Sequence, residues 1–293
     1  MIVETRGLRK QYGTHAALAG VDLAVETGSV YGLVGPNGSG KTTLLSILAG
    51  LRRPSAGTCA VAVPRGRLGL LPDTPRFEPW LSAREVVDLA RTLVAPARPR
   101  GTVAAALHEA GLGEAIDRRV GGFSRGMLQR LGLAATLVGE PELLLLDEPA
   151  AALDPLGRRE VLDLIARERG RRTVILSSHI LSDVQAVCDT VGILRAGALL
   201  YQGALHDLLT GAATPSYRVR VRAPAAGVAD ALRAEPWVRA VEMLSDGELR
   251  IAVDRVDDAE RELAGALARA GARVVSVQPE EASLEQVFLE LTR

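Results

Sequence analysis

The stretch Gly35-Pro36-Asn37-Gly38-Ser39-Gly40-Lys41-Thr42, preceded by the apolar run Val30–Val34, decides the fold of this chain. It fits the pattern Gly-x-x-x-x-Gly-Lys-Ser/Thr and lies where a strand would end and a helix begin. Glycine leaves room for a phosphate to approach backbone N–H groups, and the following helix points its positive dipole end at the same place. Lys41 adds a charge for the β- and γ-phosphates, and Thr42 adds a hydroxyl ligand for Mg²⁺. The stretch predicts a nucleotide-binding loop. It does not indicate which process the hydrolysis of that nucleotide would drive.

The composition limits the class of protein. The chain has 293 residues, of which 47% are apolar, enough for two packed domains. Its 35 basic and 35 acidic residues balance, so we expect no nucleic-acid partner. Cys59 and Cys188 have no metal-ligand or disulfide spacing, which suits a reducing cytosol. No secretion signal and no run of ~18 apolar residues is present, so we expect a soluble chain without a transmembrane segment.

Apolar runs and amphipathic stretches alternate along the first two thirds of the chain. The runs Val30–Val34, Leu143–Leu146, Thr173–Ser177 and Val191–Leu194 look like strands buried on both faces of a parallel sheet. Helical patterns dominate residues 73–140. This order predicts an α/β fold, with a mostly parallel sheet and a helical insert. Ahead of it we expect N-terminal antiparallel strands over residues 2–7 and 17–25, and a turn over residues 52–57.

The pattern changes near Gly211-Ala212-Ala213-Thr214-Pro215. Beyond this point the expected order is strand 217–222, helix 226–234, strand 237–244, strand 247–253, helix 257–270 and strand 273–278. A βαββαβ order predicts a small α+β ferredoxin-like domain. We therefore expect a first domain over residues 1–212, with a helical subdomain at about 73–140, and an accessory C-terminal domain over residues 213–293.

Two acids close the apolar run Leu143–Leu146. Asp147 and Glu148 would lie at the carboxyl end of a buried strand, the sheet edge at which ligands bind. Asp147 can hold Mg²⁺ directly or through water, and Glu148 can polarise the attacking water. The alternative is that the two acids simply cap the strand.

With both sites in hand, residues 1–210 resemble the nucleotide-binding subunits of ABC (ATP-binding cassette) proteins, which are P-loop NTPases. The segment Phe123-Ser124-Arg125-Gly126-Met127 stands at the family's spacing for its LSGGQ motif, with Arg125 and Met127 in place of glycine and glutamine. Ser124 would begin a helix whose N–H groups can face an anion. In the family that anion is ATP on the partner subunit, so the resemblance implies a head-to-tail homodimer, or a pseudo-dimer with a related cassette. An ordinary N-capped helix, with Arg125 in solvent, is the alternative.

Four further residues acquire roles from the resemblance alone. Asp154, in the D-loop-like stretch Ala152-Leu153-Asp154-Pro155, would help to link the two ATP sites across the dimer. His179 stands where the family places a histidine that senses the γ-phosphate, and Tyr12 matches the aromatic that stacks on adenine. Asp73 replaces the glutamine that normally contacts Mg²⁺ or water, and it is shorter and charged. The alternatives are a turn for Asp154 and Tyr12, a solvated histidine, and a helix N-cap for Asp73.

The predicted site therefore has three groups of residues. The catalytic residues are Glu148 and His179, and the Mg²⁺ ligands are Thr42, Asp147 and Asp73. The nucleotide-binding residues are Tyr12, Gly35, Pro36, Asn37, Gly38, Ser39, Gly40, Lys41, Thr42, Thr43, Ser124, Arg125, Gly126 and Asp154.

The C-terminal segment around Ser283-Leu284-Glu285-Gln286 also looks like the end of cassette subunits from ABC-2-type exporters. The resemblance implies an ATPase that uses ATP and Mg²⁺ to power a separate transmembrane permease at the cytoplasmic face of the cell membrane. An importer ATPase, a soluble ABC ATPase acting on DNA or ribosomes, and a P-loop kinase remain alternatives. The ~100 residues between the phosphate loop and the acidic strand are too few for a long coiled coil, which argues against the chromosome type.

Overall fold

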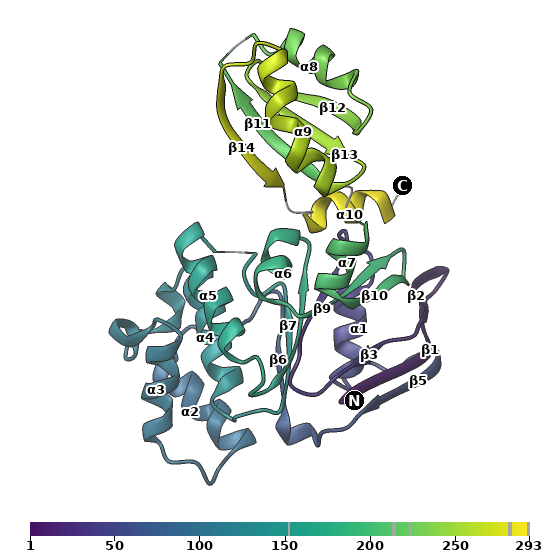
Figure 1. Ribbon diagram of the computed structural model, residues 1–293. Coiled ribbons are helices and arrows are strands. Elements are labelled where there is room, and N and C mark those ends of the chain that lie inside the picture. The colour runs from purple at the N-terminus through teal and green to yellow at the C-terminus, as the bar shows by residue number, and fades with distance from the viewer. Residues whose placement is uncertain (152, 213–214, 223, 281–282, 292–293) are drawn as a thin grey trace. The chain divides into compact units, whose positions relative to one another are not determined.

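The computed structural model in Figure 1 describes every residue except 152, 213–214, 223, 281–282 and 292–293. The chain forms two compact units, Met1–Leu205 and His206–Leu291. The division between the two units falls at the start of α7 (Leu205–Ala212). The boundary expected after residue 212 stays a prediction, since residues 213 and 214 lie outside the described part of the chain.

A six-stranded sheet in the order β10-β9-β4-β8-β7-β6 is the centre of the first unit. Its strands are β4 (Val30–Val34), β6 (Leu68–Leu71), β7 (Leu143–Asp147), β8 (Thr173–Ser178), β9 (Thr190–Arg195) and β10 (Ala198–Ala204). All pair in parallel except β10, which runs antiparallel to β9. Because β4, β7 and β8 are buried at every residue, they read in the sequence as continuous apolar runs.

Helices connect these strands and cover the sheet, as Figure 1 shows: α1 (Lys41–Leu48), α5 (Pro155–Arg167) and α6 (Leu181–Val187). The start of α1 depends on Gly40, whose φ of 109° is a conformation that glycine alone adopts easily. A Cβ at this position would also meet the Ala17 carbonyl oxygen at 2.5 Å. Strand β4 is therefore joined to α1 by a turn that tolerates no side chain at residue 40.

A four-stranded antiparallel sheet is built from three strands before the phosphate loop and one strand after it. Strand β1 (Val3–Tyr12) pairs with β2 (His15–Val21), β3 (Ala24–Val25) and β5 (Ala56–Val61). The first expected strand was too short, and the turn expected over residues 52–57 was wrong at its end, because β5 begins at Ala56. Strand β5 is exposed and rich in small residues, so only its pairing with β1 makes it a strand.

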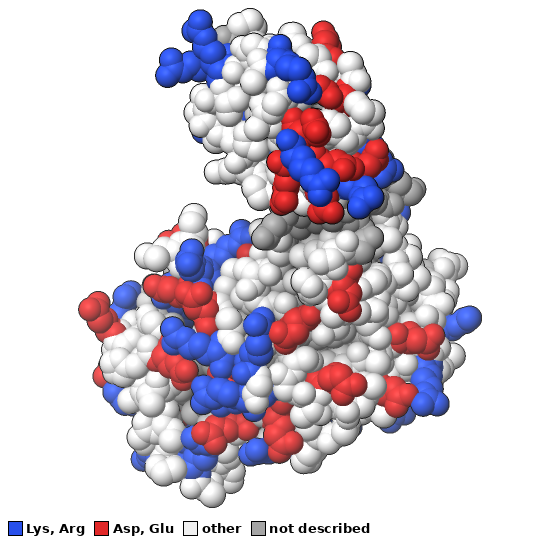
Figure 2. All heavy atoms as spheres, viewed as in Figure 1, with Lys and Arg blue, Asp and Glu red and all other residues white. Residues whose placement is uncertain are grey.

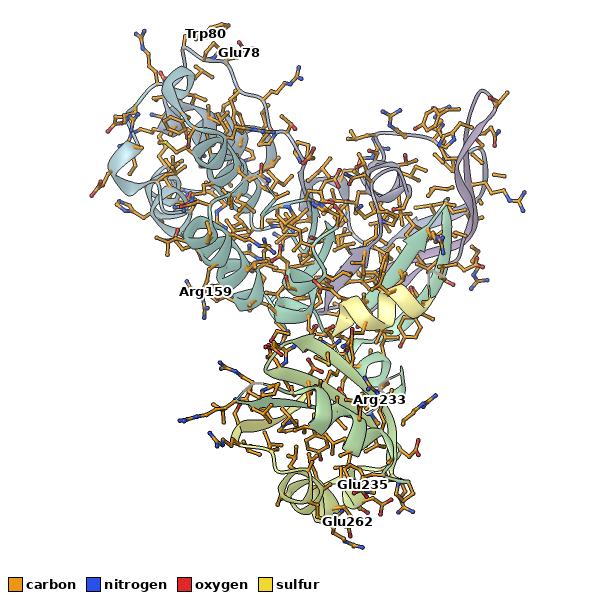
Figure 3. All side chains as sticks on the ribbon, turned by 90° about the horizontal axis from the view of Figure 1, so that it is seen from above. Glu78, Trp80, Arg159, Arg233, Glu235 and Glu262 are labelled. Carbon is orange, nitrogen blue, oxygen red and sulfur yellow. The ribbon has the colours of Figure 1, made fainter. Side chains whose placement is uncertain are left out.

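The helical subdomain lies between β6 and β7. It contains α2 (Ala83–Val94), α3 (Gly101–Glu109) and α4 (Arg125–Leu137), with short 3₁₀ turns at Gly113–Ala115 and Val120–Gly122. A further 3₁₀ turn, Arg65–Arg67, precedes β6. The helical subdomain has an apolar core of its own, which includes Val87, Leu107 and Leu131, all fully buried. The exposed Trp80 points outward from the loop before α2 (Figure 3).

The second unit has the ferredoxin-like arrangement that its βαββαβ order predicts. Its elements are β11 (Ser216–Val221), α8 (Ala226–Arg233), β12 (Val238–Ser245), β13 (Glu248–Val253), α9 (Val256–Arg269), β14 (Val274–Glu280) and α10 (Leu284–Leu291). The sheet order is β12-β13-β11-β14, and every neighbouring pair is antiparallel. Buried residues of the sheet, such as Val219 and Leu249, pack with Leu263 of α9.

Glu280 crosslinks three strands of this second sheet. Its carboxylate accepts hydrogen bonds from Arg250 Nε at 2.6 Å and from Arg218 Nη2 at 2.5 Å. The hydrogen bond from Arg250, with a smaller one from Arg218, outweighs burial and lowers the pKa of Glu280 from 4.5 to about 2. The stability contributed by this group is thus complete above pH 4.5 and is lost as the pH falls from there through about 2.

We expect Glu280→Gln to destabilise the second unit by about 1–2 kcal/mol at neutral pH, and by less at about pH 3, where the carboxyl group of the unfolded wild-type chain is mostly protonated and must lose its proton on folding. The measurement is urea unfolding followed by the fluorescence of Trp237, in a Trp80→Phe background that leaves one tryptophan. Glu242→Gln is the control, because Glu242 bonds Arg250 from an exposed position. Equal losses at both pH values would contradict the role of Glu280.

Candidate nucleotide site

The phosphate loop, residues 35–42, surrounds a buried lysine. Lys41 is only 6% exposed, and its Nζ donates hydrogen bonds to the carbonyl oxygens of Gly35 at 2.7 Å and Pro36 at 3.3 Å. A Cβ at Gly35 would clash with the backbone of Leu194 and would meet Ser39 Oγ at 2.6 Å. The loop therefore closes over the ammonium group, which lies at the N-terminus of α1, where anions are stabilised.

Next to this loop is a cavity of about 330 Å³. It brings together residues that are far apart in the sequence: Tyr12, His15, Ala17, Asn37, Gly38, Ser39, Gly40, Lys41, Thr42, Thr43, Asp73 and Glu148. All of these except His15 and Ala17 were predicted. No pattern in the sequence singles out His15, because its place at the cavity follows from the pairing of β2 with β1.

Glu148 lies between Lys41 and His179. Its Oε1 is 3.5 Å from Lys41 Nζ, and its Oε2 is 2.8 Å from His179 Nδ1. The residue follows β7 directly and has a φ of 50°, a strained conformation for a residue with a side chain. This backbone strain turns the carboxylate toward both partners, as a group that activates water beside a phosphate would require.

Ser177 is a site residue that the sequence reasoning missed. Its Oγ donates to Asp147 Oδ1 at 2.5 Å and accepts from the backbone N–H of Glu148 at 2.9 Å. Asp147 is 3% exposed, so this hydroxyl keeps a buried carboxylate hydrogen-bonded. The parallel register pairs Asp147 with Ser177, and an alignment of the two buried runs would have been the signal to find it.

Tyr12 carries two cations over its ring. Lys10 Nζ lies 5.0 Å from the ring centroid and the Arg52 guanidinium carbon lies 5.5 Å from it. Lys10 Nζ also donates to the carbonyl oxygen of Arg53 at 2.8 Å, which fixes one of these cations in place. Tyr12 is partly exposed at the cavity, as a ring that stacks on a base needs to be.

Ser124, Arg125, Gly126 and Asp154 form a separate group, and the cavity lining drawn from the described residues includes none of them. Ser124 caps α4 by accepting from Met127 N, and Asp154 caps α5 by accepting from Gly157 N at 3.2 Å. The two caps are near each other, since a Cβ on Gly126 would lie 3.0 Å from Leu153 Cδ2. Ala152 of the expected D-loop lies outside the described residues.

The donors at the cavity fit a hard cation held together with phosphate oxygens. Thr42 offers a hydroxyl and Asp73 a carboxylate at the cavity wall, and Asp147 is buried beside Glu148. Among the residues with described positions, no three or more His, Cys, Asp or Glu side chains form a metal cluster of their own. Within the same residues, no helix has the length and apolar character needed to cross a membrane.

Comparison with known proteins decides the family. The family described as "ABC transporter" matches residues 18–151, and the family "ATP-binding protein DrrA1-3-like, C-terminal domain" matches residues 203–292. An uncharacterized ABC transporter ATP-binding protein of Bacillus subtilis, YxlF, is 35% identical over 99% of this chain and 99% of its own length. The chain belongs to the family of ABC transporter ATP-binding proteins. As a member of this family it is an ATP-binding ATPase, and the predicted family, fold and enzyme class are confirmed.

Other proteins that are similar to this ABC ATPase have names that specify what they transport or resist. The daunorubicin resistance ATP-binding protein DrrA3 of Streptomyces coeruleorubidus is 35% identical over 98% of this chain and 94% of that protein. The Nod factor export ATP-binding protein I of Burkholderia orbicola is 35% identical, over 71% of this chain and 72% of that protein. A solved ATP-binding subunit of an ABC transporter covers 72% of this chain with a TM-score of 0.66 and 26% identity, and 93% of that subunit is matched.

Proposed function

We propose that this ABC ATPase is the motor subunit of an ABC-2-type exporter, which hydrolyses MgATP as a dimer and drives a separate transmembrane permease from the cytoplasmic face of the membrane. One observation carries the proposal: the similarity to a daunorubicin resistance protein extends over 98% of the chain and includes the second unit. The export protein of Burkholderia orbicola supports the same direction. Import is the rival.

The residues of the predicted site have proposed tasks in hydrolysis. Lys41 and the backbone N–H groups of the phosphate loop hold the β- and γ-phosphates, and Tyr12 stacks on adenine. Glu148 accepts a proton from the attacking water, and His179 orients Glu148 through the 2.8 Å contact and senses the γ-phosphate. Thr42, Asp147 and Asp73 would hold Mg²⁺, which supplies positive charge to the phosphate oxygens.

The separate group at Ser124, Arg125, Gly126 and Asp154 is proposed to complete the site of a second copy. The support is its place: these residues lie apart from the cavity of their own chain, at the N-termini of α4 and α5, where N–H groups favour an anion.

The balanced charge of the sequence, seen as interleaved acidic and basic residues on the face in Figure 2, gives no support for a nucleic-acid partner.

The permease is proposed to dock on the helical subdomain. Trp80 is 64% exposed in the loop that leads from β6 and Asp73 to α2. Large exposed aromatic side chains are enriched at the centre of protein interfaces. The loop runs from Asp73 at the cavity past the exposed Trp80, so a displacement of Asp73 can be transmitted along it to a permease docked at Trp80.

Replacing Glu148 by Gln tests the catalytic role. We expect turnover to fall by ~10²–10⁴ while ATP still binds, because the amide keeps the size of the side chain but cannot accept the proton. The measurement is phosphate release at saturating ATP together with equilibrium binding of a fluorescent ATP analogue. Glu142→Gln, on an exposed carboxylate paired with Arg67, is the matched control. Turnover near that of the wild type would remove Glu148 from this role.

Mixed dimers test the shared site. A chain with Lys41→Ala lacks the lysine of its phosphate loop. A chain with Ser124→Arg keeps its phosphate loop but has a damaged half-site to offer to its partner. Each chain should therefore be inactive alone. Mixed together, they restore one complete site: the phosphate loop of the Ser124→Arg chain faces the intact Ser124 of the other. We expect up to about a quarter of wild-type turnover in a one-to-one mixture, if each site works alone. No recovery would contradict the composite site.

Transport direction is tested in inside-out membrane vesicles that contain this chain and the permease encoded beside it. We expect ATP-dependent accumulation of a cargo from a panel of drugs, antibiotics, lipids and polysaccharides, beginning with daunorubicin, and none with Glu148→Gln. An exporter needs no external binding protein for this. Transport in the opposite sense, dependent on a periplasmic binding protein, would overturn the proposal and establish the importer.

A further inference from the structure

Asp183 is a buried carboxylate that has no task in the scheme above. The residue lies in the first turn of α6 and is 4% exposed, although acidic side chains are rarely buried unless they are paired. Arg158 of α5 is its partner: Nε donates to Asp183 Oδ1 at 2.7 Å, and Nη2 lies 2.6 Å from the same oxygen. Nη2 also donates to Ser182 Oγ at 3.5 Å. One guanidinium therefore joins the first turns of two helices, whereas the adjacent Arg159 points outward (Figure 3).

The two joined helices begin at two segments of the ATP site. The backbone N–H of Arg158 donates to the carbonyl oxygen of Asp154 at 2.8 Å, within the first turn of α5. The N–H of Asp183 donates to the carbonyl oxygen of Ile180 at 3.2 Å, directly after His179. The ion pair is thus one helical turn away from Asp154 on one side and one turn away from His179 on the other.

The position of His179 depends on how α6 is held. Ser178 Oγ donates to the carbonyl oxygen of Ile180 at 3.2 Å and accepts from its N–H at 3.0 Å, so the segment 178–180 is a tight turn that moves with the helix. The ring at its centre reaches Glu148 Oε2 at 2.8 Å. A displacement of α6 would therefore change the contact between His179 and Glu148.

Electrostatics connect the same groups. Burial raises the pKa of Asp183, and the hydrogen bond and charge of Arg158 oppose that rise. The charge of Glu148 raises the pKa of Asp183 further, and His179 lowers it, so these groups lie within one another's field. Arg158 therefore also neutralises a carboxylate that would otherwise repel Glu148.

We propose that the Arg158–Asp183 ion pair is a positioning device for ATP hydrolysis, which holds residues 178–180 so that His179 meets Glu148 and ties this segment to Asp154. The inference rests on the roles proposed for Glu148 and His179. The residues that line the described cavity include neither member of the ion pair, so both act through other side chains. A pair that only stiffened α5 against α6 would change the unfolding temperature and leave the turnover of the folded chain unchanged.

The test measures kcat and KM for ATP in the full-length chain with Asp183→Asn, Arg158→Gln or both. We expect each single substitution to lower kcat about tenfold and to change KM less than about twofold, because a small displacement of reacting groups affects turnover more than binding. The double variant should be no slower than the slower single one, since both substitutions remove the same contact. Arg158→Lys keeps the charge and should recover part of the loss.

Two control variants separate positioning from general stability. Arg159→Gln removes the neighbouring outward-pointing guanidinium, and Glu168→Gln breaks a buried ion pair with Arg172, 3.2 Å apart, just past the far end of α5. Both should keep kcat within about twofold of the wild type, although Glu168→Gln lowers the unfolding temperature. If Arg158→Gln matches Arg159→Gln in kcat, the proposal is overturned.

The same assay distinguishes the failure of this inference from a failure of the site assignment. If Glu148→Gln and His179→Ala lower kcat while Arg158→Gln does not, the positioning role alone is wrong. If neither Glu148→Gln nor His179→Ala lowers kcat, the catalytic roles themselves are wrong. Should a single variant fail to fold, the double variant decides, because it removes both charges and leaves no unpaired carboxylate buried; a double variant with the kcat of the wild type would overturn the proposal.

Discussion

A buried ammonium group enclosed by backbone carbonyls is the interaction on which the nucleotide site depends. Burying an ammonium group is costly unless it is hydrogen-bonded, and the carbonyl oxygens of Gly35 and Pro36 accept hydrogen bonds from Lys41, which is 6% exposed. These carbonyl oxygens reach Nζ only because the chain turns tightly around it. The turn is so tight that there is no room for a Cβ at Gly35 or at Gly40. The same turn fixes the end of β4 and the start of α1, so one set of constraints determines both the binding loop and the centre of the sheet.

The two acids at the end of β7 lie in different surroundings beside the Lys41 ammonium group. Asp147 and Glu148 are consecutive, yet their surroundings differ: Asp147 is buried and bonded by Ser177, while Glu148 turns away through a positive φ and contacts Lys41 and His179. Two neighbouring carboxylates can take different tasks only when their surroundings separate them. Here the backbone makes the separation, because a strand conformation at residue 148 would point its side chain elsewhere.

What could be predicted from the sequence was local, and what could not was set by pairing between distant segments. The phosphate loop, the apolar run Leu143–Leu146 with the two acids that follow it, and the βαββαβ order of the second unit are each contained within a stretch that carries its own signal. Strand β5 and the serine at 177 have none, because β5 is a strand only beside β1, and Ser177 meets Asp147 only through the register of β7 and β8. The Arg52 guanidinium over Tyr12 belongs to the same class of contact.

The three helix N-termini that we propose contact ATP are not equivalent, and the difference bears on the order in which they would bind it. Helix α1 starts at Gly40 with no side-chain cap, so its first N–H groups are open to a phosphate, whereas Ser124 and Asp154 already satisfy N–H groups of α4 and α5. A ligand gains more from unsatisfied donors than from donors that it must take from a cap. The phosphate loop of a single chain should therefore bind ATP first, and the capped helices of a second chain should add their contacts only when the dimer closes over a nucleotide that is already in place.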